Sequence, residues 1–379
     1  MISFTSFAFG FSLFARFLLG CQRPNHQQSI TPTNFLKRPL PLGLLLLGVA
    51  LLSVGAAAAL GSAAVAPADV VRAVGHRLGL SAAPGPVADR IVWQLRLPRA
   101  LLALCVGGGL AVVGVAMQAL VRNPLAEPYV LGISGGASAG ASLFYLGFLP
   151  PLVSRVLSLP LAAFLGGLAT ISVVYLVART ASSEGGHLSV ARLLLAGVAM
   201  SALMGAVTSF VTLASPEPGK LRAVLFWLLG SLAGAQWALL PLPALAAGGG
   251  LAACWAFSRP LDALLLGEEP AQSLGVSVEA LKRGLIGGAA LVTGLLVARA
   301  GAIGFVGLIV PHAVRLLTGA AHRRLAPLSF LAGAVFLLWA DVLARTLLPG
   351  QELPVGILTA GCGVPFFLWL LRRERYRFG

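Results

Sequence analysis

The sequence has few charged residues, and acidic residues are the scarcest. Asp, Glu, Lys and Arg make up 10% of the 379 residues, and only 12 residues are acidic. Soluble domains carry about 25% charged residues, so a water-soluble globule of this length would lack its polar surface. Because 58% of the residues are hydrophobic, the composition predicts a membrane protein.

The alternation of polar and apolar residues that marks a membrane-spanning β-strand is also missing. The apolar runs are continuous, and most have the roughly 20 residues that a helix needs to cross a bilayer. Divided at prolines and charges, they predict an all-α, polytopic membrane protein with ten transmembrane helices. The predicted spans are 41–60, 97–120, 131–149, 161–178, 193–213, 237–257, 281–298, 303–318, 326–345 and 354–371.

Cysteine is rare and is not spaced for metal binding. Cys21, Cys105, Cys254 and Cys362 form no CxxC pair, and three of them lie within apolar runs. Such positions are typical of packing residues and not of a disulfide framework or a zinc site. The sequence therefore predicts no metal site and no bound cofactor.

The net charge of +15 raises the question of nucleic acid. The Lys and Arg residues are scattered in the loops between apolar runs, without a basic face interleaved with aromatics, so the pattern does not favour nucleic-acid binding. The distribution of the basic residues instead reflects the orientation of the chain in the membrane. An even number of spans puts both termini on one side, and the C-terminal RRERYR run predicts that this side is the cytoplasm. We therefore expect a multi-pass protein of the cytoplasmic (inner) membrane.

The ten predicted spans divide into two halves of five. An odd number of spans in each half gives the halves opposite orientations, so any similarity between them would form an inverted repeat, which is common in transporters. Residues 1–38 fall outside this scheme and are predicted to be a disordered extension, while 39–379 form the transmembrane domain. The stretch 221–232 is too short to span and predicts a re-entrant or interfacial helix.

One stretch, NPLAEPYVLGISGGASAG (123–140), interrupts the apolar sequence. Its two prolines disfavour helix and predict a rigid turn between two spans. Gly136 and Gly140 form a GxxxG pair that lets helices approach closely. A simple packing turn explains the stretch equally well. GISG also matches a motif of intramembrane proteases, in which Ser134 would need His312 as its base, but so short a match is weak support.

Asp341 is the one acid inside a predicted span, and such a residue can carry protons. Because Arg345 lies one turn later at the end of that span, we expect the two to pair and Asp341 to be structural. His312 and Arg315, in PHAVR, are expected to satisfy helix ends.

Five motifs lie in order along the chain: RLPRALLALCVGGGLAVVGVAMQALVRNPLAEPYVLGISGGA (96–137), LLLGEEPAQSLGV (264–276), GAIGFVGLIVPHAVRLLTG (301–319), ADVLAR (340–345) and ELPVGILTAGCGVPFF (352–367). These motifs resemble the FecCD family of membrane permeases from ABC importers for iron-siderophores, haem and cobalamin. The resemblance covers residues 40–372.

The resemblance implies a homodimer of ten-helix permease subunits, two cytoplasmic ATPase subunits and an extracytoplasmic substrate-binding protein. The chain contains no GxxxxGK[ST] loop, so ATP and Mg²⁺ are expected on the partner ATPase and not on this chain. The sequence therefore predicts a transport subunit that is not an enzyme and that imports a metal chelate. An ion-coupled secondary transporter working without an ATPase is the alternative.

The loop GEEPAQSLGVSVEALKRG (267–284) lies within a predicted cytoplasmic coupling segment, 259–284. Two glutamates at its start suit the positive end of a short helix, Gly275 is expected to break that helix, and a second helix should follow. A solvated loop is the plainer interpretation. The resemblance assigns the docking of the ATPase to Glu268, Glu269, Ala271 and Gly275.

The resemblance also assigns a cytoplasmic gate to Asn123, Pro124 and Leu125. Three arginines predicted on the outer side run against the usual charge bias. The planar guanidinium group pairs well with carboxylates, so these residues suit acidic groups on a docking protein. Anchoring of the side chains at the membrane interface is the alternative. The arginines assigned to docking of the binding protein are Arg96, Arg99 and Arg345.

Overall fold

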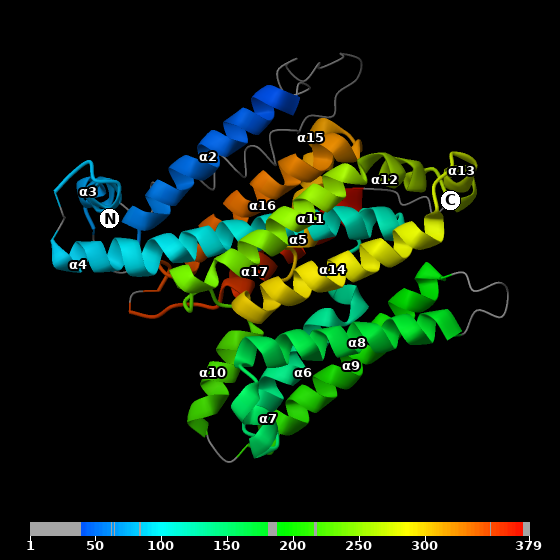
Figure 1. Cartoon of the computed structure of the whole chain (residues 1–379), viewed down its shortest axis with the longest axis horizontal. Coiled ribbons are helices and arrows are strands. Elements are labelled where there is room, and N and C mark those ends of the chain that lie inside the picture. Colours follow the sequence, from blue (N-terminus) through cyan, green and yellow to red (C-terminus); the bar gives the residue numbers. More distant parts are fainter. Residues whose placement is uncertain are drawn as a thin grey trace.

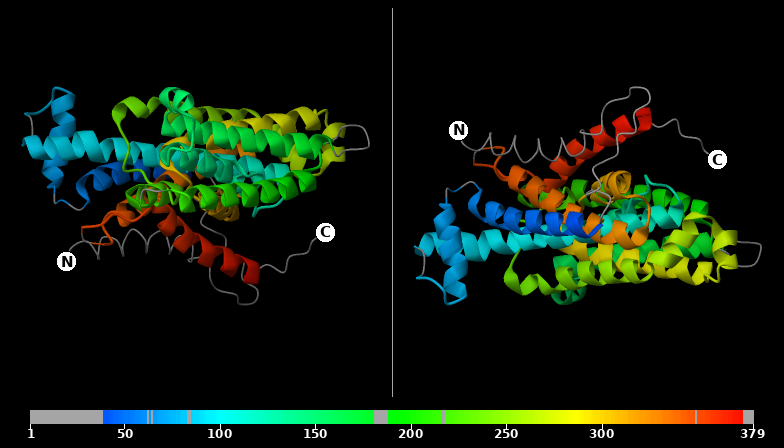
Figure 2. Two further views of the ribbon diagram at one scale, coloured as in Figure 1. Left: turned by 90° about the horizontal axis from the view of Figure 1, so that it is seen from below. Right: turned by 90° about the horizontal axis from the view of Figure 1, so that it is seen from above.

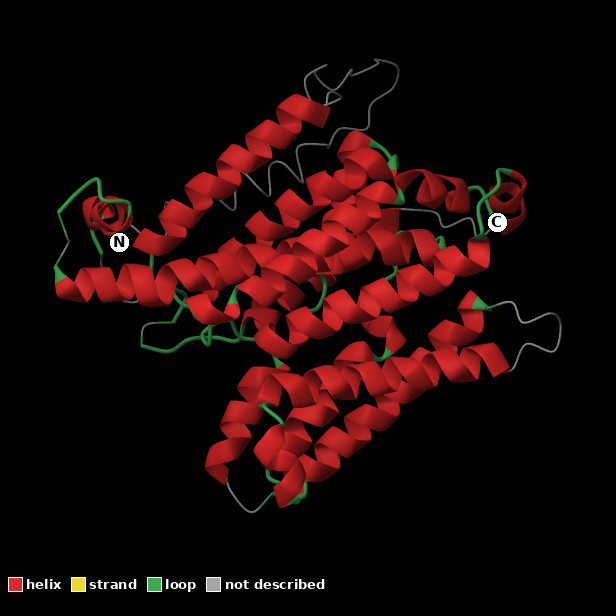
Figure 3. Ribbon diagram, in the orientation of Figure 1, coloured by secondary structure: helices red, strands yellow, loops and turns green. Residues whose placement is uncertain are grey.

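The computed structural model describes residues 39–373 except 62, 64, 83–84, 181–187, 216–217 and 349. Within these residues every regular element is helical, as Figure 3 shows. The predicted all-α class is therefore confirmed. The predicted disorder of 1–38 concerns residues outside the described part of the chain.

A helix lies at each of the ten predicted positions. They are α2 (Pro39–Ala59), α5 (Leu97–Val121), α6 (Ile133–Tyr145), α8 (Leu159–Thr180), α9 (Val190–Leu213), α11 (Pro241–Ala256), α14 (Val278–Ala300), α15 (Val306–Thr318), α16 (His322–Ala344) and α17 (Val355–Arg373). Shorter elements connect them: α3 (Pro67–Arg77), α4 (Pro86–Asp89), the π-helical η1 (Arg90–Arg96), η2 (Pro128–Leu131), α7 (Pro151–Val156), α10 (Pro218–Leu228), η3 (Trp237–Leu239), α12 (Ser258–Leu265) and α13 (Glu268–Ser273).

Among the described residues, eight helices are long and apolar enough to cross a membrane. The expectation of ten full-length spans is corrected at α6 and α15, which have 13 residues each. At 1.5 Å per residue each is about 20 Å long, short of the roughly 30 Å hydrocarbon core. Both start after a residue with positive φ, Gly132 (81°) and Phe305 (68°), where the chain turns sharply into the helix.

Helix α5 lies at the centre of the molecule. It packs against α16, α11, α14 and α15, while α6, α8 and α9 form a second group joined to the first through α14 and α8 (Figures 1 and 2). In the helix that contains α5, 78% of the residues in the most apolar stretch are buried within the chain. In α9 the corresponding share is 11%. The apolar surface of α9 therefore faces outward from the chain.

Glycines bring the backbones of the central helices together. A methyl group on Gly107 of α5 would overlap the carbonyl of Gly333 on α16, and one on Gly114 would overlap the backbone of Gly307 on α15. Missing side chains allow such close approach between membrane helices. These contacts hold α5 close against α15 and α16.

The two ends of the long axis carry different elements. Figure 1 shows α3 and α4 at one end, called here the α3 end, and α12 and α13 at the other, called the α13 end. Helices α4, η1 and α5 form a continuous helix over Pro86–Val121 that reaches the α3 end. The sequence prediction started this helix at Leu97 because the arginines before that position interrupt the apolar run.

Candidate functional site

The predicted gate residues form a tight turn after α5. Arg122 ends the helix in the left-handed conformation, with φ 53°. The Asn123 side-chain Oδ1 accepts a hydrogen bond from the Leu125 backbone N at 2.9 Å, which is the turn that asparagine favours. Asn123, Pro124 and Leu125 are all half-buried. The turn predicted from the prolines is present, and the gating role stays a prediction.

The chain after this turn is bound to the start of α15. A Glu127 carboxylate oxygen accepts from the Phe305 backbone N at 2.5 Å, and the Tyr129 hydroxyl accepts from the Ile303 backbone N at 3.0 Å. Glu127 thereby satisfies one of the free N–H groups at a helix N-terminus. The sequence analysis treated Glu127 only as part of a helix-breaking Glu-Pro pair and missed this role.

Gln118 makes a second link between α5 and α15. Its Nε2 donates to the carbonyl oxygens of Gly307 at 3.3 Å and Leu308 at 3.2 Å. Pro311 has no N–H, so the Gly307 carbonyl one turn earlier lacks its helical donor and can accept from Gln118. Arg315 donates to the Gln118 Oε1 at 3.1 Å. The gate turn therefore follows a part of α5 that is fixed to α15.

The predicted coupling segment lies at the α13 end as two short helices, α12 and α13. Glu268 and Glu269 are in the first turn of α13, as predicted, and Gly275, with φ 83°, lies just after the end of α13. The second short helix, α12, comes before α13, whereas the residues after Gly275 begin the long helix α14. A helix follows Gly275, as the sequence predicted, but it is the beginning of the long helix α14 and not a second short helix, because α14 starts at Val278, before the predicted span at 281.

Ala271 does not contribute surface to this segment. Its side chain is fully buried in a cluster with Leu264, Val278 and Leu281. It holds α13 against α12 and α14, so any surface that a partner touches is made by its neighbours, including Glu269. The docking role of the segment stays a prediction.

Two buried cationic or titratable residues behind the segment were missed. Lys282 was not singled out from the sequence, yet its side chain is 2% exposed and lies 2.6 Å from Glu268. His322, at the start of α16, is fully buried and lies 2.6 Å from Asp262 of α12. Only the tertiary fold brings the two residues of each pair together. The scarcity of acidic residues in this apolar chain could still have marked Glu268 and Asp262 as candidates for buried ion pairs.

Arg96 and Arg345, predicted to dock a binding protein, cap the end of α2. Arg96 Nη1 donates to the carbonyl oxygens of Ala58 at 3.0 Å and Ala59 at 2.7 Å. Arg345 Nη2 donates to the Ala57 carbonyl at 2.7 Å. Both arginines are 5% exposed. Cations are stabilising at a helix C-terminus, where carbonyl groups lack donors.

Arg99 joins the same region to two acids. Its guanidinium lies 2.9 Å from Asp341, which is 2% exposed, and 2.9 Å from Glu352, whose side chain is 44% exposed. Arg345 lies 3.6 Å from Asp341, as the one-turn spacing predicted, but Arg99 is the closer partner. Asp341 is therefore held by arginine on both sides, which supports its expected structural role. Whether these arginines dock a partner stays a prediction.

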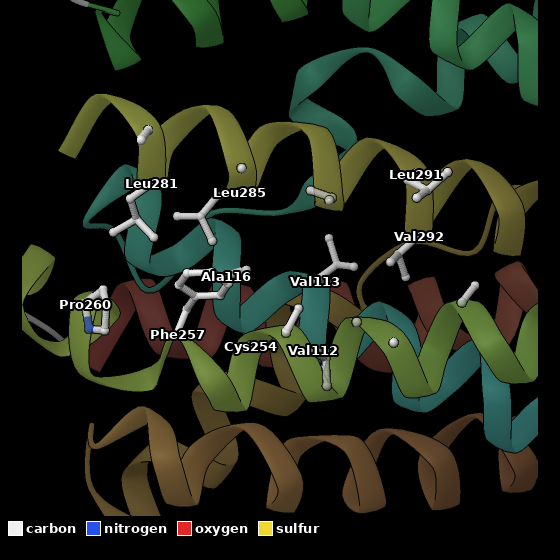
Figure 4. Close-up of a pocket in the computed structure, with 18 of the residues that line it drawn as sticks. Val112, Val113, Ala116, Cys254, Phe257, Pro260, Leu281, Leu285, Leu291 and Val292 are labelled. Atoms are coloured by element: carbon white, nitrogen blue, oxygen red, sulfur yellow. The ribbon is translucent and has the colours of Figure 1, made fainter. Parts of the chain in front are cut away.

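A cavity of about 680 Å³ opens between α5, α11 and α14. Figure 4 shows its lining, with Leu281 and Leu285 of α14, Val113 and Ala116 of α5, and Phe257 directly after α11. No charged side chain lines it, and no group of metal-ligating side chains occurs among the described residues. Cys254 is the one metal-ligating side chain in the lining, and one thiol alone does not make a metal site.

Ser134 and His312, which a protease mechanism would need to pair, form no hydrogen bond with each other. His312 is 3% exposed, and neither of its ring nitrogens has a hydrogen-bond partner within the described chain. It therefore activates no serine in this structure, Ser134 included. His312 also lies within α15 and not at a helix end as expected, whereas Arg315 binds Gln118.

This combination of a helical membrane domain, a half-length helix in each half of the chain and paired short helices at one end defines a transporter permease fold. A structure solved as the inward-facing conformation of an ABC transporter assigned to the metal-chelate type matches with a TM-score of 0.75 and 31% identity. The match covers 89% of this chain and 100% of that one.

Residues 45–373 match the FecCD transport family, and the chain belongs to that family. It is 45% identical to the cobalamin import system permease protein BtuC of Halobacterium salinarum, over 76% of this chain and 75% of the relative. It is 44% identical to the hemin transport system permease protein HmuU of Yersinia pestis, over 75% and 84%. It is 43% identical to the Fe(3+) dicitrate transport system permease protein FecD of Escherichia coli K12, over 75% and 86%. The chain is thus a multi-pass, non-catalytic permease subunit of an ABC importer.

Proposed function

We propose that this permease imports a metal chelate of the ferric siderophore, haem or cobalamin kind. The support comes from its relatives, since three at 43–45% identity are named for cobalamin, hemin and Fe(3+) dicitrate. The cavity lining is apolar and does not select among these cargoes. Selection of the cargo is therefore assigned to a separate binding protein.

The proposed assembly is a homodimer of this chain with two ATPase subunits, which hold ATP and Mg²⁺, and one extracytoplasmic binding protein. The α13 end is proposed to face the cytoplasm together with both termini. Figure 2 supports this orientation, because α2 runs toward the α3 end and α17 runs away from it. The membrane is the cytoplasmic (inner) membrane.

Ten membrane-embedded helices in two inverted halves of five complete the proposed architecture. The third and eighth helices of the series, α6 and α15, are the two half-length ones, with 13 residues each. Glu127, which precedes η2 and α6, accepts a hydrogen bond from the backbone N of Phe305 at the start of α15. Short helices at equivalent positions of the two halves are what an inverted repeat produces.

In the proposed mechanism, the ATPase binds the exposed side of α12 and α13 and moves this segment during its nucleotide cycle. The motion tilts the attached long helices and opens the turn at Asn123, Pro124 and Leu125. The single observation that carries this assignment is the position of α12 and α13, which project as two short helices at one end of the bundle (Figure 1).

The test is charge reversal on α13. We expect Glu268→Lys with Glu269→Lys to abolish co-purification of the ATPase, because two cations replace the acids of its first turn. Glu269→Lys alone tests the exposed surface of α13 without disturbing the buried ion pair, because the partner of Lys282 on α13 is Glu268. Asp69→Lys on α3, at the opposite end, is the matched control. Retention of the ATPase at wild-type stoichiometry by the double variant would refute the docking assignment.

A further inference from the structure

Lys282 is a buried lysine whose three donors are all occupied. Its Nζ lies 2.6 Å from Glu268 Oε2, 3.1 Å from the Leu188 carbonyl oxygen and 3.4 Å from Glu279 Oε1. An ammonium group has three N–H donors and no acceptor, so this arrangement saturates it. At 2% exposure the side chain has left water almost completely, which is costly unless the charge is fully paired.

The three acceptors belong to three different parts of the chain. Glu268 opens α13, Glu279 lies in the first turn of α14, and Leu188 precedes α9. Both carboxylate oxygens of Glu279 also accept from the Leu188 backbone N, each at 3.3 Å. A single ammonium group and one carboxylate therefore join α13 to the beginnings of two long helices.

A second joint connects α12 to another long helix. Asp262 Oδ1 accepts from the backbone N of His322 at 2.9 Å and contacts its ring Nδ1 at 2.6 Å. His322 begins α16, which packs along α5 through Gly107 and Gly333. Each short helix of the coupling segment is thus tied by its own polar joint to the part of the bundle behind it.

We propose that Lys282 is a positioning residue that makes α13 move as one body with the starts of α9 and α14. This inference rests on the proposed function, because it names the residue that transmits the motion of the coupling segment. A role in stability alone does not call for a charge here, since apolar residues of similar volume often replace buried ion pairs without loss. A polar joint instead fixes one relative orientation of three separate segments.

Spin labels test this directly in the complex with its ATPase and binding protein. In a cysteine-free background, one label is placed at Gln272 on α13 and one at Leu195 on α9, both exposed. We expect the distance between them to stay the same with and without ATP and vanadate, and Lys282→Met to make it nucleotide-dependent. A wild-type distance that changes with nucleotide, or a Lys282→Met distance that does not, overturns the proposal.

The ATPase rate supplies a readout that needs no identified cargo. With Lys282→Met we expect stimulation by the binding protein to fall at least about fivefold, the lower range of coupling between sites, while the ATPase still co-purifies. Arg283→Met removes the neighbouring exposed cation and should leave stimulation unchanged. Unchanged stimulation in Lys282→Met overturns the proposal. Failure of the wild-type chain to bind an ATPase refutes the proposed function instead.

Glu268→Gln keeps the test decisive if Lys282→Met does not fold. In this variant Lys282 retains the Leu188 carbonyl and Glu279 as acceptors, so the fold should persist while the link to α13 weakens. We expect stimulation by the binding protein to fall below that of the wild type while the ATPase still co-purifies, because the link between Lys282 and α13 is weakened. Wild-type stimulation in Glu268→Gln would overturn the proposal, whereas loss of the ATPase would show an effect on docking instead.

Discussion

Both ends of the molecule hold buried cations, but their partners differ. At the α3 end, Asp341 is 2% exposed and lies between Arg99 and Arg345. At the α13 end, Lys282 is equally buried, yet the side chains of its partners Glu268 and Glu279 are 34% and 30% exposed. At the α3 end the central acid, Asp341, is dry and only the outer acid, Glu352, is exposed, whereas at the α13 end both acids that pair with the buried cation reach the surface.

The difference indicates what each end can do. A dry cluster is expensive to open, because any separated charge remains in a medium of low dielectric constant. Arg96 and Arg345 add hydrogen bonds to the last carbonyls of α2, so the α3 end is fixed. Acids that reach the surface can be rehydrated or contacted by another protein at lower cost. A partner protein can therefore change the conformation of the α13 end at a lower energetic cost than that of the α3 end.

The largest effect is expected where the dry cluster loses its central acid. Asp341→Asn leaves Arg99 and Arg345 without that negative charge, and breaking a buried pair from one side typically costs about 3 kcal/mol or more of folding stability. The apparent melting temperature in detergent, followed by size-exclusion fluorescence, should therefore drop strongly. Glu352→Gln is the control, because its more exposed carboxylate should contribute at most about 1 kcal/mol. Equal melting temperatures for the two variants would contradict the comparison.

Sequence reasoning anticipated features that depend on local chemistry. The helix positions follow from the apolar runs, the turn at Asn123 from the prolines, and the start of α13 from Glu268 and Glu269. It overestimated the length of α6, because the mostly apolar residues 146–149 after the helix and Leu131 before it continue the hydrophobic run without continuing the α-helix. Hydropathy reports apolar character and does not detect a turn at Gly132.

Contacts between distant segments were out of reach. Lys282 follows Glu279 by one turn, but its burial depends on Leu188 and Glu268, which only the tertiary fold brings near. Likewise, Arg96 and Arg345 were assigned to the docking of a partner because guanidinium groups on the predicted outer side suit carboxylates of another protein. The carbonyls at the end of α2 provide the alternative partner, and no local pattern reveals them.

A smaller effect on stability is expected from the same kind of substitution at the α13 end. Glu268→Gln should lower the free energy of unfolding by about 1 kcal/mol or less, because a third of this side chain is in water and Lys282 keeps two other acceptors. The melting temperature in detergent should remain within a few degrees of wild type, since such an energy shifts the midpoint of a large domain only slightly. A drop as large as that of Asp341→Asn would show that the two ends do not differ in this way.

The smallest effect is expected at the rim of the α3 end, and it depends on the proposed docking of a binding protein there. Arg99 is the docking candidate whose second acid, Glu352, is open to water, with Nη1 donating to both of its carboxylate oxygens at 3.1 and 2.9 Å. Glu352→Gln removes a competing negative charge and leaves Arg99 freer to bind a carboxylate of the partner. Affinity for the binding protein, titrated at low salt, should rise by up to about fivefold, the range of one exposed ion pair.

Salt supplies the control for this last prediction. The gain should shrink as ionic strength rises, because interactions between exposed charges are screened beyond a distance of about 10 Å at 0.1 M salt. Weaker affinity at low salt would show that Glu352 itself contacts the partner, and would contradict the competition between Glu352 and the partner for Arg99. Unchanged affinity would show that Arg99 belongs wholly to the internal cluster, which makes this part of the α3 end a structural clamp and not a docking surface.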